Sequence, residues 1–344
     1  MPALFVATNG LSIWRSHDLG ETLARMPTST GLYSGSRVWS LLSTPRGLLA
    51  GTDSGIYRWD QANARFIPLP SPTDCQVVTA LACGPDNPDV ILAGTQPAAL
   101  YRSTDGGASW TKLDVGMKPH VSSGFQDNAA LAAQQGANRP PARHWTRVTQ
   151  IVFDPHDAKA VWAGVEIGGA WRSSDGGITW TQSSDGLRTQ DVHGFAVVHN
   201  GSRIVYATTN DGFYVSRDDG HHWQQQMIDS PWQYTRSVAQ CADAGPVMFV
   251  TNGDGAPGTA GRLFRSEDFG AHWRDVRLPG EVETSVYFLA TNQADPALIF
   301  AAAAIGQLYR STDHGRSWTA LKRRLGEIRA LAWLPDETAL TPRS

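Results

Sequence analysis

The sequence predicts an all-β fold: a seven-bladed β-propeller whose blades are four-stranded antiparallel sheets. Three observations predict it. The pattern Ser-x-Asp-x-Gly occurs six times, and in all but the first copy Trp follows three residues after the Gly. A seventh, eroded copy at 57–66 keeps the Tyr, the Arg and the closing aromatic residue. Seven units in 344 residues give about 49 residues each, the length of a propeller blade.

Each unit is predicted to form four short strands in the same order. In the third unit these strands are 77–82, 90–94, 100–102 and 109–113, separated by turn residues. The Ser-x-Asp-x-Gly box then lies in the turn between the third and fourth strands. Its Ser and Asp side chains can bond to the backbone of such a turn, while its Gly supplies a positive φ.

The six box aspartates are therefore interpreted as structural, rather than as acids or metal ligands. A catalytic site needs one convergent cluster, and these residues are spread evenly along the chain. We expect the closing Trp to pack beneath each turn. The box aspartates are Asp18, Asp105, Asp175, Asp218, Asp268 and Asp313.

The ends of the chain predict a closed ring. Residues 4–7 match the second strand of a unit and 328–333 match a first strand. We therefore expect residues 1–344 to form one propeller in which 1–27 and 328–335 together make blade 1, which removes exposed sheet edges. One step between units is longer than the others, and this predicts an insertion at 114–146 between blades 3 and 4. A loop of that length in a compact domain is either a functional lid or disordered, and we expect a lid over the channel mouth.

The box resembles the BNR or Asp-box repeat, and the chain is similar to the sialidase-like BNR propellers. That resemblance implies the propeller fold, which sialidases, seven-bladed xyloglucan-type glycoside hydrolases, sorting-receptor ectodomains and photosystem assembly factors of the Ycf48 type share. It does not imply one activity. Seven blades, and the lack of an Arg-Ile-Pro motif near the N-terminus, argue against a true sialidase.

Composition narrows the function classes. The net charge is −3 and no basic run is present, so we expect no nucleic-acid partner. The N-terminus has neither a signal-peptide pattern nor a membrane span, so we expect a cytoplasmic monomer with no membrane partner. Three cysteines, Cys75, Cys83 and Cys241, fit no metal or redox spacing and are expected to be free and reduced.

Two rings of residues are expected on the face opposite the boxes, at the channel mouth. The first lies at the start of the innermost strands and includes four arginines, which suit a carboxylate, sulfate or phosphate because guanidinium groups bind such anions bidentately. The alternative is salt bridges between blades, with Asp191, Glu327, Glu281 or Glu283 as the partners. Alignment of the units places Arg37 and Arg147 at a first level of this ring, and Arg329, Arg236, His193 and Tyr287 at a second level two residues further along the strands.

The second ring ends the second strands, and its Asn, Asp, Gln and Glu residues suit either hairpin turns or a hard cation. Its members are Asn9, Asp53, Gln96, Glu166, Asn210 with Asp211, and Asn252 with Asp254. Near the two rings, Glu166, Asp191 and His193 are the candidate acid–base residues. If a divalent metal is the cofactor, its candidate ligands are His144, Glu166 and His193. Further candidates for contact with a substrate are His144, Trp145, Trp232, Tyr234 and Tyr287.

Together these features predict that the mouth binds a small anionic or glycan-like molecule. Hydrolase, lyase or metal-dependent chemistry on that molecule is a further prediction. The alternative is a non-catalytic scaffold or assembly factor that binds a protein partner. We expect a small molecule or glycan rather than a protein, because the insertion lies where a substrate lid would lie.

Overall fold

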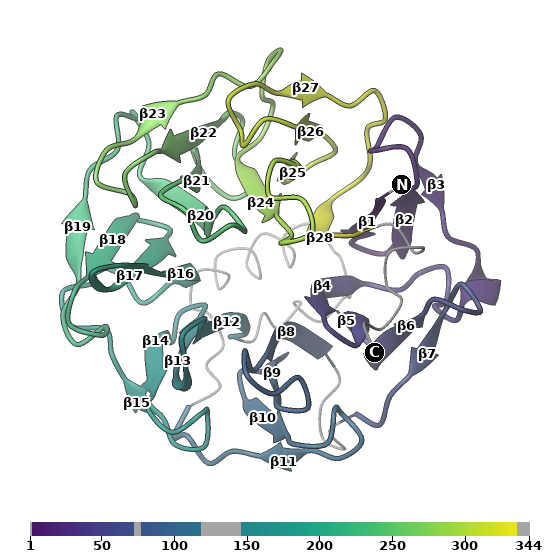
Figure 1. Ribbon diagram of the computed structural model, residues 1–344, viewed down its shortest axis with the longest axis horizontal. Helices are drawn as coiled ribbons and strands as arrows, with labels where there is room; N and C mark the ends of the chain where they lie inside the picture. Colours follow the sequence, from purple (N-terminus) through teal and green to yellow (C-terminus); the bar gives the residue numbers. More distant parts are fainter. Residues whose placement is uncertain (1, 72–76, 118–145, 336–344) are drawn as a thin grey trace, which may run out of the picture.

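The computed structural model describes residues 2–71, 77–117 and 146–335. Its strands form seven four-stranded antiparallel sheets arranged as blades around a central channel (Figure 1). One short 3-10 turn, Thr28–Thr30, is the helical element of the described residues. The predicted seven-bladed propeller is therefore confirmed. No helix in the described parts of the chain is long and apolar enough to span a membrane.

In every blade the first strand lies nearest the channel and the fourth lies at the rim (Figure 1). Blades 1 to 3 consist of β28 (Ile328–Leu334), β1 (Ala3–Thr8), β2 (Ile13–Ser16) and β3 (Ala24–Arg25); β4 (Val38–Thr44), β5 (Gly47–Thr52), β6 (Gly55–Asp60) and β7 (Arg65–Pro68); and β8 (Val77–Cys83), β9 (Ile91–Gln96), β10 (Leu100–Ser103) and β11 (Thr111–Lys112).

Blades 4 and 5 consist of β12 (Val148–Asp154), β13 (Asp157–Val165), β14 (Gly169–Ser173) and β15 (Thr181–Gln182); and β16 (Val192–Asn200), β17 (Ser202–Thr209), β18 (Gly212–Ser216) and β19 (Gln224–Gln226). Blades 6 and 7 consist of β20 (Tyr234–Gln240), β21 (Met248–Gly253), β22 (Gly261–Ser266) and β23 (Arg274–Asp275); and β24 (Val286–Ala290), β25 (Ile299–Ala303), β26 (Leu308–Ser311) and β27 (Thr319–Ala320).

The ring closes through its last strand, as the sequence predicts. Strand β28 (yellow in Figure 1) pairs antiparallel with β1 (purple), with Trp333 opposite Leu4 and Leu331 opposite Val6. The apolar core lies in the spaces between neighbouring blades. At the closing junction, Leu4, Val6 and Trp333 pack against side chains of blade 7 in one buried cluster.

The Ser-x-Asp-x-Gly boxes organise their turns by hydrogen bonds. In blade 1, the Ser16 hydroxyl donates to Asp18 (2.7 Å) and accepts from the amide of Gly20 (2.8 Å). The amide and hydroxyl of Thr22 donate to the Asp18 carboxylate at 2.9 and 2.6 Å. The hydroxyl of Thr22 makes the largest contribution to lowering the pKa of Asp18, to about 2. The structure thus gives this carboxylate a structural use.

Each box also ties its blade to the preceding one. The residue that follows the box Asp has a positive φ, from 56° at Phe269 to 75° at Gly176. Its carbonyl accepts a hydrogen bond from the preceding blade in all six copies. The donor–acceptor pairs are Arg58–Gly106, Arg102–Gly176, Trp162–Asp219, Tyr206–Phe269, Arg265–His314 and Arg310–Leu19.

Blade 2, whose box is eroded, is joined to blade 1 differently. The guanidinium of Arg15 lies 4.8 Å from the ring centroid of Trp59, in cation–π geometry. The closing tryptophans vary in burial. Trp180 and Trp223 are buried, whereas Trp110, Trp273 and Trp318 are partly exposed. The box backbone, rather than a uniformly buried Trp, is therefore the shared element of the blade junctions.

Candidate functional site

Every innermost strand carries a β-bulge at the same place near the channel mouth. In β12, for example, Val148 pairs with Val165 and Gln150 with Gly164, so Thr149 has no partner opposite it. A bulge bends the strand and redirects a side chain. The bulged residues of the seven blades are Arg329, Trp39, Thr79, Thr149, His193, Arg236 and Tyr287. In β20 the bulge also includes Ser237.

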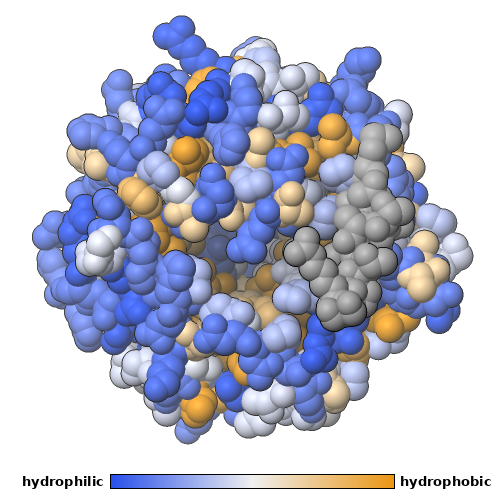
Figure 2. All heavy atoms as spheres, in the orientation of Figure 1, coloured by the Kyte–Doolittle hydropathy of each residue, from blue (hydrophilic) through white to orange (hydrophobic). Residues whose placement is uncertain are grey.

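The bulged residues line two connected spaces. Beneath the bulges, a channel cavity of about 280 Å³ is lined by all of them except Tyr287. Figure 2 shows a hollow at the centre of the ring. A larger cavity of about 480 Å³ lies at the mouth, and His193, Arg236 and Arg329 line both spaces. The remaining walls of this mouth cavity are Arg147, Glu166, Asp191, Tyr234, Ala256, Pro257, Tyr287, Ala304, Ile305 and Glu327.

Two of the arginines in the mouth cavity are neutralised by a neighbouring carboxylate. Arg147 Nε lies 2.7 Å from Glu166 Oε2, and the backbone of the same two residues is hydrogen-bonded at 2.9 Å. Arg329 is ion-paired with Glu327, which also accepts a hydrogen bond from Asn9 at 2.5 Å. Both guanidinium groups flank Trp39, with centroid distances of 5.3 and 4.5 Å. These contacts fit the salt-bridge interpretation of the arginine ring.

The third acid of the cavity faces a histidine. His193 Nδ1 lies 2.6 Å from the carbonyl oxygen of Thr235. His193 Nε2 lies 3.4 Å from Asp191 Oδ1. Burial opposes ionisation of Asp191, but His193 and the charges of Arg236 and Arg147 outweigh burial and lower the pKa of that carboxyl. Asp191 is therefore ionised at neutral pH.

Arg236 differs from the other two arginines of the cavity. Within the described residues its guanidinium makes neither an ion pair nor a hydrogen bond, and it lies 5.0 Å from the ring centroid of Tyr287. Tyr287 in turn stacks with Tyr234, whose hydroxyl donates to the Tyr287 hydroxyl at 3.1 Å. Burial opposes the charge of Arg236, yet the tyrosines and the carboxylates Glu166 and Asp191 raise its pKa. The cavity thus presents a permanent positive charge.

For the other two arginines, the effect of burial on the pKa outweighs that of the neighbouring charges. Burial lowers the pKa of Arg147 despite the adjacent Glu166. Burial likewise lowers the pKa of Arg329 to about 10, against the effect of Glu327. Burial also raises the pKa of Tyr234, so this phenol stays neutral and can donate a hydrogen bond. The arginines and Tyr234 of the cavity wall are thus more buried than its carboxylates Glu166 and Glu327, which are partly exposed.

The structure brings most, but not all, of the predicted site residues together. Arg37 is exposed and lines neither space, so the predicted convergence of four arginines is corrected to three. The acid that corresponds to Glu166 is Asp53 in blade 2. Its carboxylate accepts a hydrogen bond from the hydroxyl of Tyr33 at 2.5 Å, so it pairs with Tyr33 rather than with the guanidinium of Arg37.

Trp232 is a second correction. It lies outside the cavity, where its ring contacts the guanidinium of Arg262 at 5.3 Å. His144 and Trp145 lie outside the described residues, as does most of the 114–146 insertion, so the lid stays a prediction. The metal hypothesis also stays a prediction, because His144, one of its three proposed ligands, lies outside the described residues. Of its other two candidates, Glu166 pairs with Arg147 and His193 faces Thr235 and Asp191.

Residues of the second ring mainly hold loops at the mouth. The Asp254 carboxylate accepts hydrogen bonds from the amide and hydroxyl of Thr259, and the Asn252 amide group donates to the carbonyls of Trp232 and Tyr234. The loop that Asp254 fixes carries Ala256 and Pro257 into the cavity wall. Sequence reasoning missed these two residues, although the Gly- and Pro-rich run 253–261 signals an irregular loop.

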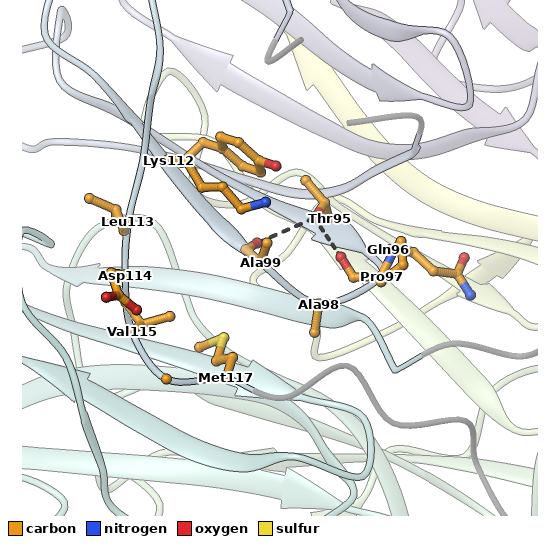
Figure 3. A pocket seen from close by; sticks show the side chains of 12 residues that line it. Thr95, Gln96, Pro97, Ala98, Ala99, Lys112, Leu113, Asp114, Val115 and Met117 are labelled. Atoms are coloured by element: carbon orange, nitrogen blue, oxygen red, sulfur yellow. Dashed lines mark hydrogen bonds between the residues drawn. The ribbon is translucent and has the colours of Figure 1, made fainter. Parts of the chain in front are cut away.

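A separate cavity of about 370 Å³ lies at the side of blade 3 (Figure 3). The hydroxyl of Thr95 donates to the carbonyls of Pro97 and Ala99 there, at 2.6 and 3.4 Å. Its charged lining residues are Lys112 and Asp114. It lacks the concentration of acids, arginines and aromatic rings found at the mouth, so we take the mouth cavity as the candidate site.

Comparison with known proteins agrees with the repeat and the fold. The BNR-Asp box repeat model matches residues 263–276. A xyloglucanase of Paenibacillus sp. is 30% identical over 254 residues, which are 68% of this chain and 20% of that protein. A further curated relative is the xyloglucanase Xgh74A of Acetivibrio thermocellus, 23% identical over 316 residues, or 77% of this chain and 35% of that protein. The chain thus spans about a fifth to a third of the length of these curated relatives.

Solved structures show the same fold. The GH74 enzyme of Niastella koreensis superposes with a TM-score of 0.65 at 20% identity, over 86% of this chain and 46% of that one. YCF48 bound to D1 peptide superposes with a TM-score of 0.50 at 13% identity, over 83% and 81%. At these identities the likeness is one of fold, so the scaffold alternative stays a prediction.

Proposed function

We propose that this BNR/Asp-box propeller binds an acidic carbohydrate in the mouth cavity, with an anionic group of the sugar on Arg236. The observation that carries the proposal is the state of Arg236. Its guanidinium lines the cavity without an ion pair or hydrogen bond from the described residues, while the other two arginines of the cavity each have a carboxylate. A bidentate carboxylate, sulfate or phosphate would satisfy it.

The distribution of charge in the cavity, rather than its net charge, favours an anion at Arg236. The three arginines carry three positive charges, and Glu166, Asp191 and Glu327 supply three negative ones. Two of these carboxylates are held by Arg147 and Arg329, and Asp191 faces His193. An arriving anion therefore meets, in Arg236, a guanidinium that no carboxylate of the described residues pairs with. An anion bound there also avoids much of the competition with water that exposed arginines experience.

The remaining wall suits a sugar ring. Tyr234 and Tyr287 form a stacked aromatic pair beside Arg236, and Ala256, Pro257 and Ile305 add apolar surface. A volume of about 480 Å³ lies in the ordinary range for small-molecule sites. The curated relatives named xyloglucanase support a carbohydrate as the ligand class.

Cleavage of the bound saccharide would be a further step, for which Glu166, Asp191 and His193 stay the candidates. Glycoside hydrolysis ordinarily uses two carboxyl groups, one of which donates a proton to the leaving group. Asp191 is held ionised by His193 and the arginines, so we expect it to act as a base rather than as the acid. Glu166 donates no proton while it is paired with Arg147. The arrangement therefore favours binding as the primary function.

The experiment is a ligand screen by saturation-transfer NMR, followed by calorimetry. Oligosaccharides that contain uronic acid or sulfate are compared with neutral xyloglucan oligosaccharides of the same length. We expect the acidic ligands to bind at least tenfold more tightly, and Arg236→Gln to lose that preference. Arg37→Gln is the matched control, because it removes an arginine of the same face that lies outside the cavity.

Equal binding of neutral and acidic ligands that survives in Arg236→Gln would overturn the role given to the anion. Hydrolysis is measured on the same ligands by reducing-end release. Binding without release would restrict the function to recognition. Release that is lost in Asp191→Asn but kept in Arg37→Gln would add catalysis to the same cavity.

A further inference from the structure

A second cluster of reactive side chains lies on the other face of the ring, between blades 6 and 7. The Sγ of Cys241, a carboxylate oxygen of Asp243 and a ring nitrogen of His314 all lie within 4.8 Å of one another. We propose that these three side chains bind a thiophilic divalent metal ion of the zinc class. No part of this inference depends on the ligand proposed for the mouth cavity.

The backbone holds the three ligands in place from two different blades. Cys241 follows β20 directly, and its amide donates to the carbonyl of Val247 at 2.8 Å. Asp243 lies in the same turn, where one carboxylate oxygen accepts from the amide of Gly245 at 3.0 Å. The other oxygen lies 3.9 Å from Nε2 of His314. One oxygen thus fixes the turn and leaves its partner available to a metal.

His314 belongs to the Asp box of blade 7. Its amide donates to the carbonyl of Ala297 at 3.2 Å, and its carbonyl accepts from Arg265 at 2.9 Å. Its φ is +59°, so the box imposes the position of the imidazole. At the corresponding position the other boxes have Leu19, Gly106, Gly176, Asp219 and Phe269. Among the six boxes, a histidine therefore stands at this position in the blade 7 box, and that is the box that lies beside Cys241.

The distances require only a small closure. In a tetrahedral zinc site with Zn–S near 2.3 Å and Zn–N near 2.0–2.1 Å, ligand atoms lie about 3.3–3.6 Å apart. The Asp243–His314 separation is 3.9 Å and all three ligand atoms lie within 4.8 Å of one another, so the partly exposed Asp243 and His314 side chains have to rotate toward the buried Cys241 Sγ to close the rest. Cys241 is buried at the base of the cluster, while Asp243 and His314 reach solvent. This leaves an entry path and a fourth position for water.

The charge at the site is compatible with a cation. The neighbouring guanidinium of Arg265 is ion-paired with Glu267 at 2.5 Å. The Cys241 thiol donates to the carbonyl of Pro296 at 3.1 Å. Metal binding therefore replaces the thiol proton: the S–H bond breaks, an S–metal bond forms, and the proton passes to solvent. Thiolate and imidazole together select zinc over magnesium or calcium.

The test measures zinc on the full chain after treatment with a chelator and dialysis against a limiting zinc buffer. We expect one zinc ion per chain and, with cobalt as the probe, a thiolate-to-cobalt charge-transfer band. Cys241→Ser should abolish the band and weaken zinc binding at least tenfold. Cys83→Ser is the matched control, because Cys83 ends the innermost strand β8 of blade 3, near the turn position that Cys241 occupies in blade 6.

Two further variants separate metal binding from folding. His314→Asn keeps a residue that tolerates positive φ, and Asp243→Asn keeps the acceptor for the Gly245 amide. Both should weaken zinc binding while the far-ultraviolet circular dichroism stays that of the parent. The proposal is overturned if the parent chain takes up no zinc, or if binding and the cobalt band persist in Cys241→Ser and His314→Asn.

Discussion

Replacing Arg203 with methionine should destabilise the junction of blades 4 and 5 severely. Arg203 contacts Asp154, whose side chain has no exposed surface, and also contacts Asp157 and Asp219, which are part-exposed. His199 Nε2 lies 2.9 Å from the same Asp154 carboxylate. Without Arg203, the buried Asp154 carboxylate keeps the His156 amide and His199 as hydrogen-bond partners but loses its permanent countercharge.

The expected loss in free energy of unfolding follows from these exposures. Removing one partner of a buried ion pair costs about 3–5 kcal/mol, because the remaining charge stays desolvated. The two exposed pairs add about 0.2–1 kcal/mol each. We therefore expect Arg203→Met to lose about 3–7 kcal/mol, and Arg217→Met, an exposed arginine on the same blade, to lose under about 0.5 kcal/mol.

The assay is urea unfolding followed by tryptophan fluorescence, at pH 7 and at low pH. Asp154 has a lowered pKa in the folded protein: burial opposes this, but the His156 amide, His199 and Arg203 outweigh it. Its stabilising effect is therefore present above the unfolded pKa of about 4 and lost as the pH falls through the folded value. The difference between parent and Arg203→Met should shrink below about pH 4.

A second variant checks the cause. Asp154→Asn in the Arg203→Met background removes the buried charge while keeping an acceptor for the amide of His156, which lies 2.7 Å away. It should recover part of the lost stability. If Arg203→Met is as stable as Arg217→Met, or if Asp154→Asn lowers its stability further, the reasoning from a buried, uncompensated carboxylate is refuted.

Two other predictions follow from the fold and the mouth cavity. Tyr206→Phe removes the 2.7 Å hydrogen bond from a buried hydroxyl to the box carbonyl of Phe269 and should lower the free energy of unfolding in urea by about 1–2 kcal/mol. Tyr33→Phe, on an exposed phenol, should lower it by under about 0.5 kcal/mol. Equal losses in the two variants would contradict the role of Tyr206 at the blade junction. Arg329 is cationic below its pKa of about 10, so affinity for an anionic saccharide, measured by calorimetry, should fall as the pH rises through 10. An Arg329→Gln variant should lack that fall in affinity. If the fall persists in the variant, Arg329 is not the group that causes it.

Much of the fold was predictable because the repeat is local. Ser, Asp and Gly fix each box turn through bonds that span four residues, such as Gly20 to Ser16, so the sequence period reveals the blades directly. The ring closure follows from a first strand placed at the end of the chain. The contacts between blades could not be read in this way. The donor to the box carbonyl is an Arg in some blades and a Trp or Tyr in others, and it lies 48–74 residues away or at the other end of the chain.

The candidate site was predictable in its register but not in its contacts. Alignment of the units places Arg329, His193, Arg236 and Tyr287 at one level, and the structure gives each of them a bulge. No sequence pattern marks these bulges. The prediction that Arg37 joins the cavity was wrong for a reason of tertiary structure. Asp53 corresponds to Glu166, the acid partner of Arg147, but its carboxylate accepts a hydrogen bond from Tyr33.

We propose above that the mouth cavity holds an anion on Arg236. The most direct measurement is a crystal structure of the protein soaked with a selenate- or sulfate-bearing saccharide, phased so that the anion is located by its anomalous signal. We predict a peak within hydrogen-bond distance of the Arg236 guanidinium, beside Tyr287, that disappears in Arg236→Gln crystals and persists in Arg37→Gln crystals. A peak at Arg37 or elsewhere on the surface, with none at the mouth, would contradict the account.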